Sequence, residues 1–281
     1  MCWSPSRISG RADKVPITFG FGPPEAEFWR WAFLMTRIGA ALFAAPFFGA
    51  TMVPPQIRVI ATAALAALVA NWTHAPAPVH LLSLAGMVAV LGEIVVGLAL
   101  GFVLQIAFAA PQIGAEIISG GMGMGLAATV DPQNGARSPV IGQYFGVVLT
   151  LVFLSTGGHL QWIALIVKSY AVFPPGAVLG AAGQAGSFGV AQIHTLLGFA
   201  TAMFATAVTI ALPVSLVLML VQVLTGVLSR SAPALNLFSL GLPAGIVAGI
   251  AALISAAPMM TDRMVTLSAD AIDAASRLLG G

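Results

Sequence analysis

Three ionisable residues lie within or beside long apolar stretches of the sequence: Arg37, Glu93 and Glu116. A charge that faces lipid at the centre of a bilayer costs about 2.5–3.5 kcal/mol, so each residue is expected to face protein or water. Buried charges of this kind can mark an ion pathway. The alternative is that each glutamate bonds to a neighbouring helix or lies at the membrane edge, and this is the interpretation we favour from sequence.

The two glutamates are too far apart to act together. They are separated by 23 residues, which on one straight helix is roughly 35 Å along the axis. A carboxylate dyad needs its two groups in contact, so Glu93 and Glu116 cannot form one without a chain reversal between them. The sequence therefore gives no support to a proton relay.

Other catalytic motifs are missing from the sequence. His74, His80 and His159 lack the spacing of three or four that a helical metal pair needs, and Cys2 is the single cysteine. There is no G-x-x-x-x-G-K phosphate loop and no G-x-S-x-G nucleophile elbow. We therefore predict a protein that is not an enzyme and that has no catalytic, cofactor-binding or metal site.

The most unusual passage is Gly120–Leu126 (GGMGMGL), followed shortly by Asp131-Pro132. Glycines make a backbone adaptable, and unbranched methionines fill irregular gaps. Irregular backbone at membrane depth is tolerated only where it is buried in protein or lines a cavity, which would suit a pore constriction or plug. An ordinary external loop after a helix explains the same composition equally well, and the residues alone leave both possibilities open.

Small residues also recur at intervals of four, which lines up flat grooves on one face of a helix. Such grooves let helix backbones approach closely where lipid removes the usual hydrophobic driving force. The alternative is chance, because glycine is common in membrane helices. The candidate packing residues are Gly97 and Gly101, Gly142 and Gly146, and the double step Gly241, Gly245 and Gly249.

The composition explains why these features must be interpreted in a membrane. Of the 281 residues 59% are hydrophobic and 7% are charged, and the mean hydropathy is +1.00. An average soluble domain of this length carries about 70 charged residues, whereas this chain has 20. An ordinary soluble enzyme is thereby excluded, and the few scattered basic residues argue against a nucleic-acid partner.

Apolar runs of this length in lipid must be helical, because every backbone amide has to be satisfied within its own segment. About six hydrophobic helices are expected, several of them too long for a simple vertical span. Their expected ranges, cut by turn signals, are Trp29–Pro54, Pro55–Asn71, Val79–Ala110 (ending before Pro111), Val140–Tyr170, Val190–Leu228 and Leu235–Met260. Residues 120–139 are expected to be irregular.

Several stretches together resemble the FliR family of flagellar export-gate proteins, whose injectisome relatives are called SctT. The similarity covers about Phe28 to Met260. Its most telling stretches are RIGAALFAAPFF at 37–48, GEI at 92–94, GAEII at 114–118 with Met122-Gly123 and Asp131-Pro132, GHL at 158–160, and LSRSAP at 228–233. Each is weak alone, and their order and spacing are specific together.

The resemblance implies an all-α membrane subunit of the type III export apparatus in the bacterial inner membrane, at the flagellar basal body. In that family FliR associates with FliP and FliQ subunits around a conduit for unfolded flagellar proteins, and FlhB-like and FlhA-like components are further implied partners. FliR is similar to a FliP-like part fused to a FliQ-like part. Here residues 190–260 would be the FliQ-like hairpin, and the loop after Glu116 would be the plug across the closed pore.

The domain organisation that follows has three parts. Residues 1–24 form a polar N-terminal extension, residues 25–262 a helical membrane domain, and residues 263–281 a polar C-terminal tail. Within the domain the gate and plug residues implied by the resemblance are Glu116, Gly120, Gly121, Met122, Gly123, Met124, Gly125, Asp131 and Pro132. Three alternatives remain: the equivalent injectisome subunit, a secondary transporter or channel for a small solute, and an intramembrane enzyme, for which the sequence offers no credible catalytic pair.

Overall fold

The structure is a computed structural model that describes residues 24–48, 53–72, 83–124, 140–176, 188–231 and 241–280. Within these ranges the regular elements are all helices: α1 (Pro24–Ala44), α2 (Pro55–Trp72), α3 (Leu84–Gly121), α5 (Val140–Ser155), α6 (Gly158–Val172), α7 (Val190–Ser231) and α8 (Leu242–Leu278). The described residues therefore confirm the expected all-α class.

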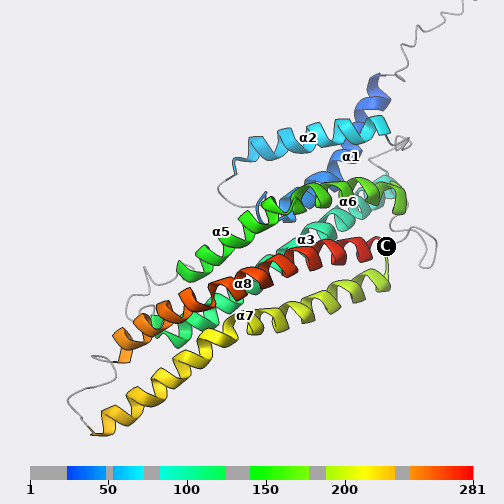
Figure 1. Ribbon diagram of the computed structural model, residues 1–281. Helices are drawn as coiled ribbons and strands as arrows, with labels where there is room; N and C mark the ends of the chain where they lie inside the picture. Colours follow the sequence, from blue (N-terminus) through cyan, green and yellow to red (C-terminus); the bar gives the residue numbers. More distant parts are fainter. Residues whose placement is uncertain are drawn as a thin grey trace, which may run out of the picture.

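Helix α3 is the central element of the fold. It contacts α1, α5, α7 and α8, and α2 packs against α1. The long helices lie side by side along one axis, with α7 and α8 forming a hairpin and α2 on the opposite side of the molecule (Figure 1). Residues distant in sequence therefore meet mainly across the surface of α3.

Three of the described helices are long and apolar enough to cross a membrane: α3, α7 and α8. The α5–α6 pair counts as a fourth crossing if its two bent halves are taken as one span. The expected set of about six hydrophobic helices is not confirmed in the part of the chain described. The expected class, an all-helical membrane protein, is confirmed.

The spanning helices are longer than a bilayer requires. Helix α7 has 42 residues and is about 63 Å long, against roughly 30 Å of hydrocarbon. Fitting all of it into that layer would require a tilt of about 60°, beyond the range of about 0–40° seen for membrane helices. Part of α7 must therefore extend outside the lipid.

Pro111 does not end α3, contrary to the expected boundary at Ala110. The helix continues through it to Gly121, and Pro111 itself is buried. Proline removes one backbone hydrogen bond, but neighbouring helices make this tolerable in a membrane helix. A boundary drawn from the local proline signal alone was therefore wrong, because packing around α3 stabilises the longer helix.

The expected single helix Val140–Tyr170 is in fact two helices bent by 70°. The break lies at Gly157, whose φ of +73° falls in the left-handed region that glycine adopts without strain. The next residue, Gly158, faces the ring of Phe153: a β-carbon there would lie 2.6 Å from Phe153 Cε2. These two glycines allow the chain to turn sharply between α5 and α6.

Residues 263–278, treated above as part of a polar tail, continue α8 as a helix. Their apolar side chains recur at helical spacing and are buried against the core, whereas the charged ones face outward. The buried apolar set is Met264, Leu267, Ala271, Ala274, Ala275 and Leu278. The low hydropathy of this stretch thus reflects a helix with one polar face.

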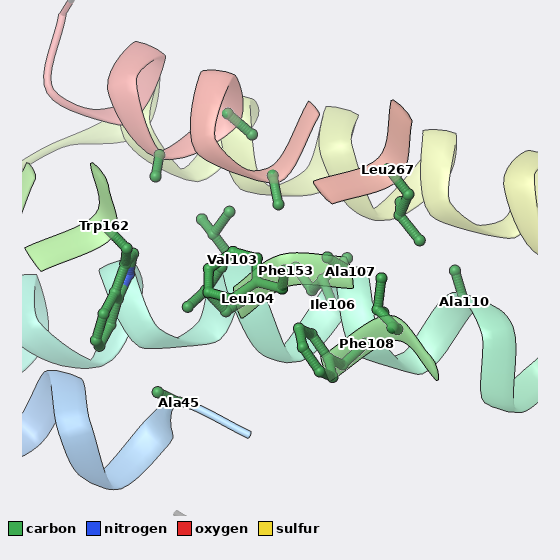
Figure 2. Close-up of a cluster of buried hydrophobic side chains, with 14 of the residues drawn as sticks. Ala45, Val103, Leu104, Ile106, Ala107, Phe108, Ala110, Phe153, Trp162 and Leu267 are labelled. Atoms are coloured by element: carbon green, nitrogen blue, oxygen red, sulfur yellow. The ribbon is translucent and has the colours of Figure 1, made fainter. Parts of the chain in front are cut away.

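A buried aromatic cluster fills the angle between α3, α5 and α6. Phe153 and Phe108 pack edge to face with ring centroids 6.0 Å apart (Figure 2). The Phe47 ring contacts both of them and also contacts Trp162, which is fully buried. The indole Nε1 of Trp162 donates to the carbonyl oxygen of Leu100 at 3.2 Å. The cluster thereby attaches α6 to the middle of α3.

Substitution of Gly158→Ala should destabilise the chain by about 1–3 kcal/mol, because the new β-carbon overlaps the Phe153 ring. Thermal unfolding in detergent measures the effect. Gly198→Ala is the matched control, because Gly198 has no atom near its β-position and alanine favours the helix. Equal midpoints for the two variants would contradict this account of the bend.

Candidate functional site

Arg37 of α1 and Glu93 of α3 form a buried bidentate ion pair. The guanidinium Nε donates to Glu93 Oε2 at 2.8 Å, and Nη2 donates to Oε1 at 3.0 Å. Both side chains are 0% exposed. Each residue was expected from the sequence to be a buried charge, and the structure shows that the two are partners.

Helix α6 and the residues after it complete the environment of the pair. Arg37 Nη1 donates to the Ser169 hydroxyl at 3.1 Å, and Nη2 donates to the carbonyl oxygen of Phe173 at 2.8 Å. The backbone N–H of Gly176 donates to Glu93 Oε1 at 3.2 Å. The guanidinium also lies over the Tyr170 ring, 4.2 Å from its centroid. This polar network, defined by these six residues, joins α1, α3 and α6.

The geometry satisfies the conditions under which a buried ion pair is tolerated. Removing two charges from water costs several kcal/mol each, and only good geometry with additional hydrogen bonds offsets that cost. Here the planar guanidinium matches the carboxylate fork, and the remaining donors of Arg37 reach neutral oxygens. The network is therefore suited to fixing helices in one arrangement.

Close backbone approach between α1 and α3 positions the pair. Gly97 lies one helical turn after Glu93, and a β-carbon there would collide with the carbonyl oxygen of Arg37. At Gly101 a β-carbon would lie 2.6 Å from the carbonyl oxygen of Ala41. The absence of side chains at these two positions lets α1 come near enough for Arg37 to reach Glu93.

Glu116 lies on the same helix as Glu93 but near its far end, and its side chain is exposed. The two carboxylates are thus well separated, as the sequence predicted. Nothing in this geometry places Glu116 in the polar network.

The Gly/Met-rich passage begins within α3. Gly120 and Gly121 are still helical, so the irregular stretch starts after Gly121 and not at Gly120 as expected. The Gly121 carbonyl oxygen accepts from Gln222 Nε2 of α7 at 2.9 Å. Gly123 has φ +80°, and a β-carbon there would collide with Leu242 Cδ2 of α8. The end of α3 is therefore packed against the α7–α8 hairpin.

Met122 occupies the small-residue groove of α8. Its side chain is 1% exposed. A β-carbon at Gly249 would lie 2.7 Å from Met122 Cγ, and one at Gly245 would lie 3.4 Å from its carbonyl oxygen. The glycine step of α8 thus accommodates a residue of α3, whereas Met124 is half-buried against the core.

The other candidate glycines differ in their surroundings. Gly142 is buried on α5, but at Gly146 the nearest atom to a β-carbon would be Gln112 Nε2 at 4.0 Å, an ordinary separation. Gly241 is the N-cap position of α8. Three of the expected plug residues, Gly125, Asp131 and Pro132, lie outside the described residues.

Sequence reasoning did not find the partners contributed by α6. Ser169, Tyr170 and Gly176 have no motif, and they lie more than 70 residues from Glu93. One signal was available: Ser169 and Tyr170 are adjacent polar residues near the end of α6, directly after Lys168, and polar groups that become buried need partners. Within the ranges that the structure describes, no group of three or more metal-ligating residue types is close enough to hold an ion.

These features define a class: an all-helical membrane protein whose internal charges fix helix packing. The family model for bacterial export proteins, family 1, matches residues 28–271. The chain therefore belongs to this family, and the resemblance to the FliR family and its injectisome relatives is confirmed.

Individual relatives agree with this assignment. The flagellar biosynthetic protein FliR of Escherichia coli K12 is 29% identical over 232 residues, covering 80% of this chain and 83% of the relative. FliR of Bacillus subtilis is 31% identical over 226 residues, covering 79% and 85%. The surface presentation of antigens protein SpaR of Shigella flexneri is 36% identical over 150 residues, covering 53% and 55%.

Replacement of Arg37→Met should destabilise the chain by about 3–5 kcal/mol, because Glu93 is left buried without its counterion. The double variant Arg37→Met with Glu93→Leu should regain most of that loss. Thermal unfolding in detergent compares them, with exposed Glu116→Gln as the control. Additive costs in the double variant would show that the two side chains are not coupled.

Proposed function

We propose that this chain is a non-catalytic subunit of the flagellar type III protein export apparatus, where it builds and seals the membrane conduit for unfolded proteins with FliP-like and FliQ-like subunits. Membership of the bacterial export family carries the proposal. The supporting physical observation is an apolar surface that lipid alone cannot cover.

That surface is clearest on α7, where exposed apolar side chains continue along nearly the whole helix. The set is Val190, Ile193, Leu197, Phe204, Val208, Leu212, Leu216, Val217, Met219, Leu220, Val223, Leu224, Val227 and Leu228. From first to last it extends about 57 Å, whereas the hydrocarbon layer is roughly 30 Å thick. Contiguous apolar surface beyond the lipid favours burial against other protein chains, as expected of a subunit in a larger assembly.

The α7–α8 hairpin is our candidate for the FliQ-like part. Its two helices contact each other along the hairpin, and α3 packs against both. A hairpin so exposed on its outer side offers helix faces to sister subunits. FlhA-like and FlhB-like components and an inner-membrane basal-body location belong to the same proposal, and energy would be supplied by the proton-motive force and a separate ATPase.

We assign the sealing of the conduit to the segment 120–139, with Glu116 preceding it on α3. Support comes from its described beginning, where residues 120–124 are packed against α7 and α8. A segment that closes a pore needs a fixed attachment, which this packing provides. The equivalent injectisome subunit is the second candidate function, favoured by the similarity to SpaR.

The proposal predicts small helical membrane partners in several copies. The chain, expressed with neighbouring export genes and extracted in mild detergent, should co-purify with them, and native mass spectrometry measures the assembly. In a flagellated bacterium that lacks its own family member, the chain should restore secretion of flagellar proteins. Recovery as a monomer that transports a small solute in liposomes would instead support a solitary transporter.

Gly123→Val should damage the seal, because valine is strained at φ +80° and its β-carbon overlaps Leu242. We expect either an ion leak across the membrane or a block of secretion, measured by membrane potential and by secreted flagellin. Gly198→Val on α7 is the matched control, since no atom lies within 4 Å of its β-position and it lies outside the segment 120–139. Wild-type secretion with an intact ion barrier in the Gly123 variant would argue against the assignment.

A further inference from the structure

The two methionines of the Gly/Met-rich passage have different surroundings. Met122 is among the largest fully buried side chains of the described residues, whereas Met124 is half-buried. A side chain enclosed by another helix cannot also project into an aqueous conduit. The buried position of Met122 therefore does not fit the role in the obstruction that the family resemblance implies for it.

The contacts around Met122 form a knob in a hole. Its side chain fills the space beside Gly249: a β-carbon on Gly249 would lie 2.7 Å from Met122 Cγ and 3.1 Å from Met122 Sδ. Gly245, one turn earlier on α8, leaves room for the Met122 backbone. Because Gly249 has no side chain, α8 has space at that position for an unbranched thioether, whereas a β-carbon at Gly245 would be in ordinary van der Waals contact.

Helix α7 holds the same point of α3 from the other side. Leu218 Cδ1 lies 3.0 Å from the position of a β-carbon on Gly121, and Leu218 is itself buried. Gln222 adds the side-chain hydrogen bond to the Gly121 carbonyl oxygen. The last turn of α3 thus meets both helices of the hairpin within two consecutive residues.

We propose that Met122 is a positioning residue, a fixed anchor that docks the end of α3 into the Gly245–Gly249 groove and stays there while proteins pass. The inference rests on the proposed export function and refines it, since Met122 then belongs to the scaffold and not to the moving obstruction. It also gives the α8 glycine step a specific occupant.

A disulfide across the groove distinguishes between two roles of Met122, a fixed anchor and a part of the moving obstruction. Because Gly249's β-position is 2.7 Å from Met122 Cγ and a C–C bond is about 1.5 Å long, cysteines at the two positions would have β-carbons within about 4.2 Å, inside disulfide reach. The variant carries Met122→Cys and Gly249→Cys in a Cys2→Ser background. Loss of maleimide-reactive thiols on oxidation measures the bond in the chain itself.

For an anchor, the oxidised chain should secrete flagellar protein at least as well as the reduced chain, because the bond replaces the lost packing. A secretion block on oxidation that a reductant reverses would overturn the inference, as would failure of the two cysteines to bond. The single-cysteine variants under the same oxidant are the controls. If the Cys2→Ser parent itself fails to restore secretion, the proposed export function fails, and the anchor role fails with it. Disulfide formation still reports whether residue 122 lies in the Gly245–Gly249 groove.

A double-mutant cycle between Gly249 and Met122, measured by the thermal unfolding midpoint, provides a second test that does not depend on export. Gly249→Ala should lower the unfolding midpoint by about 2–8 °C, because its methyl group overlaps Met122. Adding Met122→Ala should cost less in that variant than in the parent, since the shorter side chain no longer overlaps. Gly226→Ala on α7, with open space, is the control.

The conservative variant Met122→Leu should retain secretion. Met122→Ala should lose secretion and should have a lower unfolding midpoint. Equal effects of Gly249→Ala and Gly226→Ala, or strictly additive costs in the double variant, would overturn the anchor.

Discussion

Helix α3 packs its backbone against α1 only because Gly97 and Gly101 have no side chains to hold the two apart. In lipid, apolar side chains gain little by leaving their surroundings, so helix association depends on close van der Waals contact and on polar bonds. Gly97 and Gly101 allow the close van der Waals contact, and Glu93, one turn before Gly97, makes the polar bonds. The short distance between Arg37 and Glu93 is thus a consequence of the glycines, and the ion pair then stabilises the approach that the glycines permit.

The ion pair contributes more to specificity than to net stability. A buried pair roughly offsets its own desolvation, so apolar residues of similar volume could hold the helices equally well. What apolar residues lack is direction: the guanidinium of Arg37 is satisfied only when Glu93, Ser169 and the Phe173 carbonyl are all in place. An arrangement shifted by one turn would leave charges unpaired in a dry interior, which costs several kcal/mol. The network therefore selects one register of α1, α3 and α6 from among many apolar alternatives.

The sequence predicted features that depend on composition and local spacing. The membrane class, the apolar helices and the glycine steps follow from hydropathy and periodicity, and the family followed from the order of short stretches. Prediction failed where tertiary packing overrode a local signal. Pro111 lies inside α3 because its neighbours stabilise the helix, and Val140–Tyr170 breaks at Gly157 because α6 must return to Leu100 through Trp162. The Arg37–Glu93 pair could not be derived, since nothing in one sequence indicates which buried charges meet.

The two ends of α3 have separate tasks that its stiffness links. Glu93 fixes one part of the helix to α1 and α6, and Met122 fixes the other to α7 and α8. These residues are roughly 44 Å apart along the axis at 1.5 Å per residue. Although Pro111 removes one backbone hydrogen bond, α3 remains helical from Glu93 to Gly121, and a helix changes little in length. The hairpin therefore cannot shift along α3 without vacating the Met122 groove, and α1 cannot shift without breaking a buried ion pair. Because both costs are several kcal/mol, the described helices form a scaffold of fixed dimensions. Under the proposed export function, an opening motion would then arise in segments attached to this scaffold or between it and neighbouring subunits.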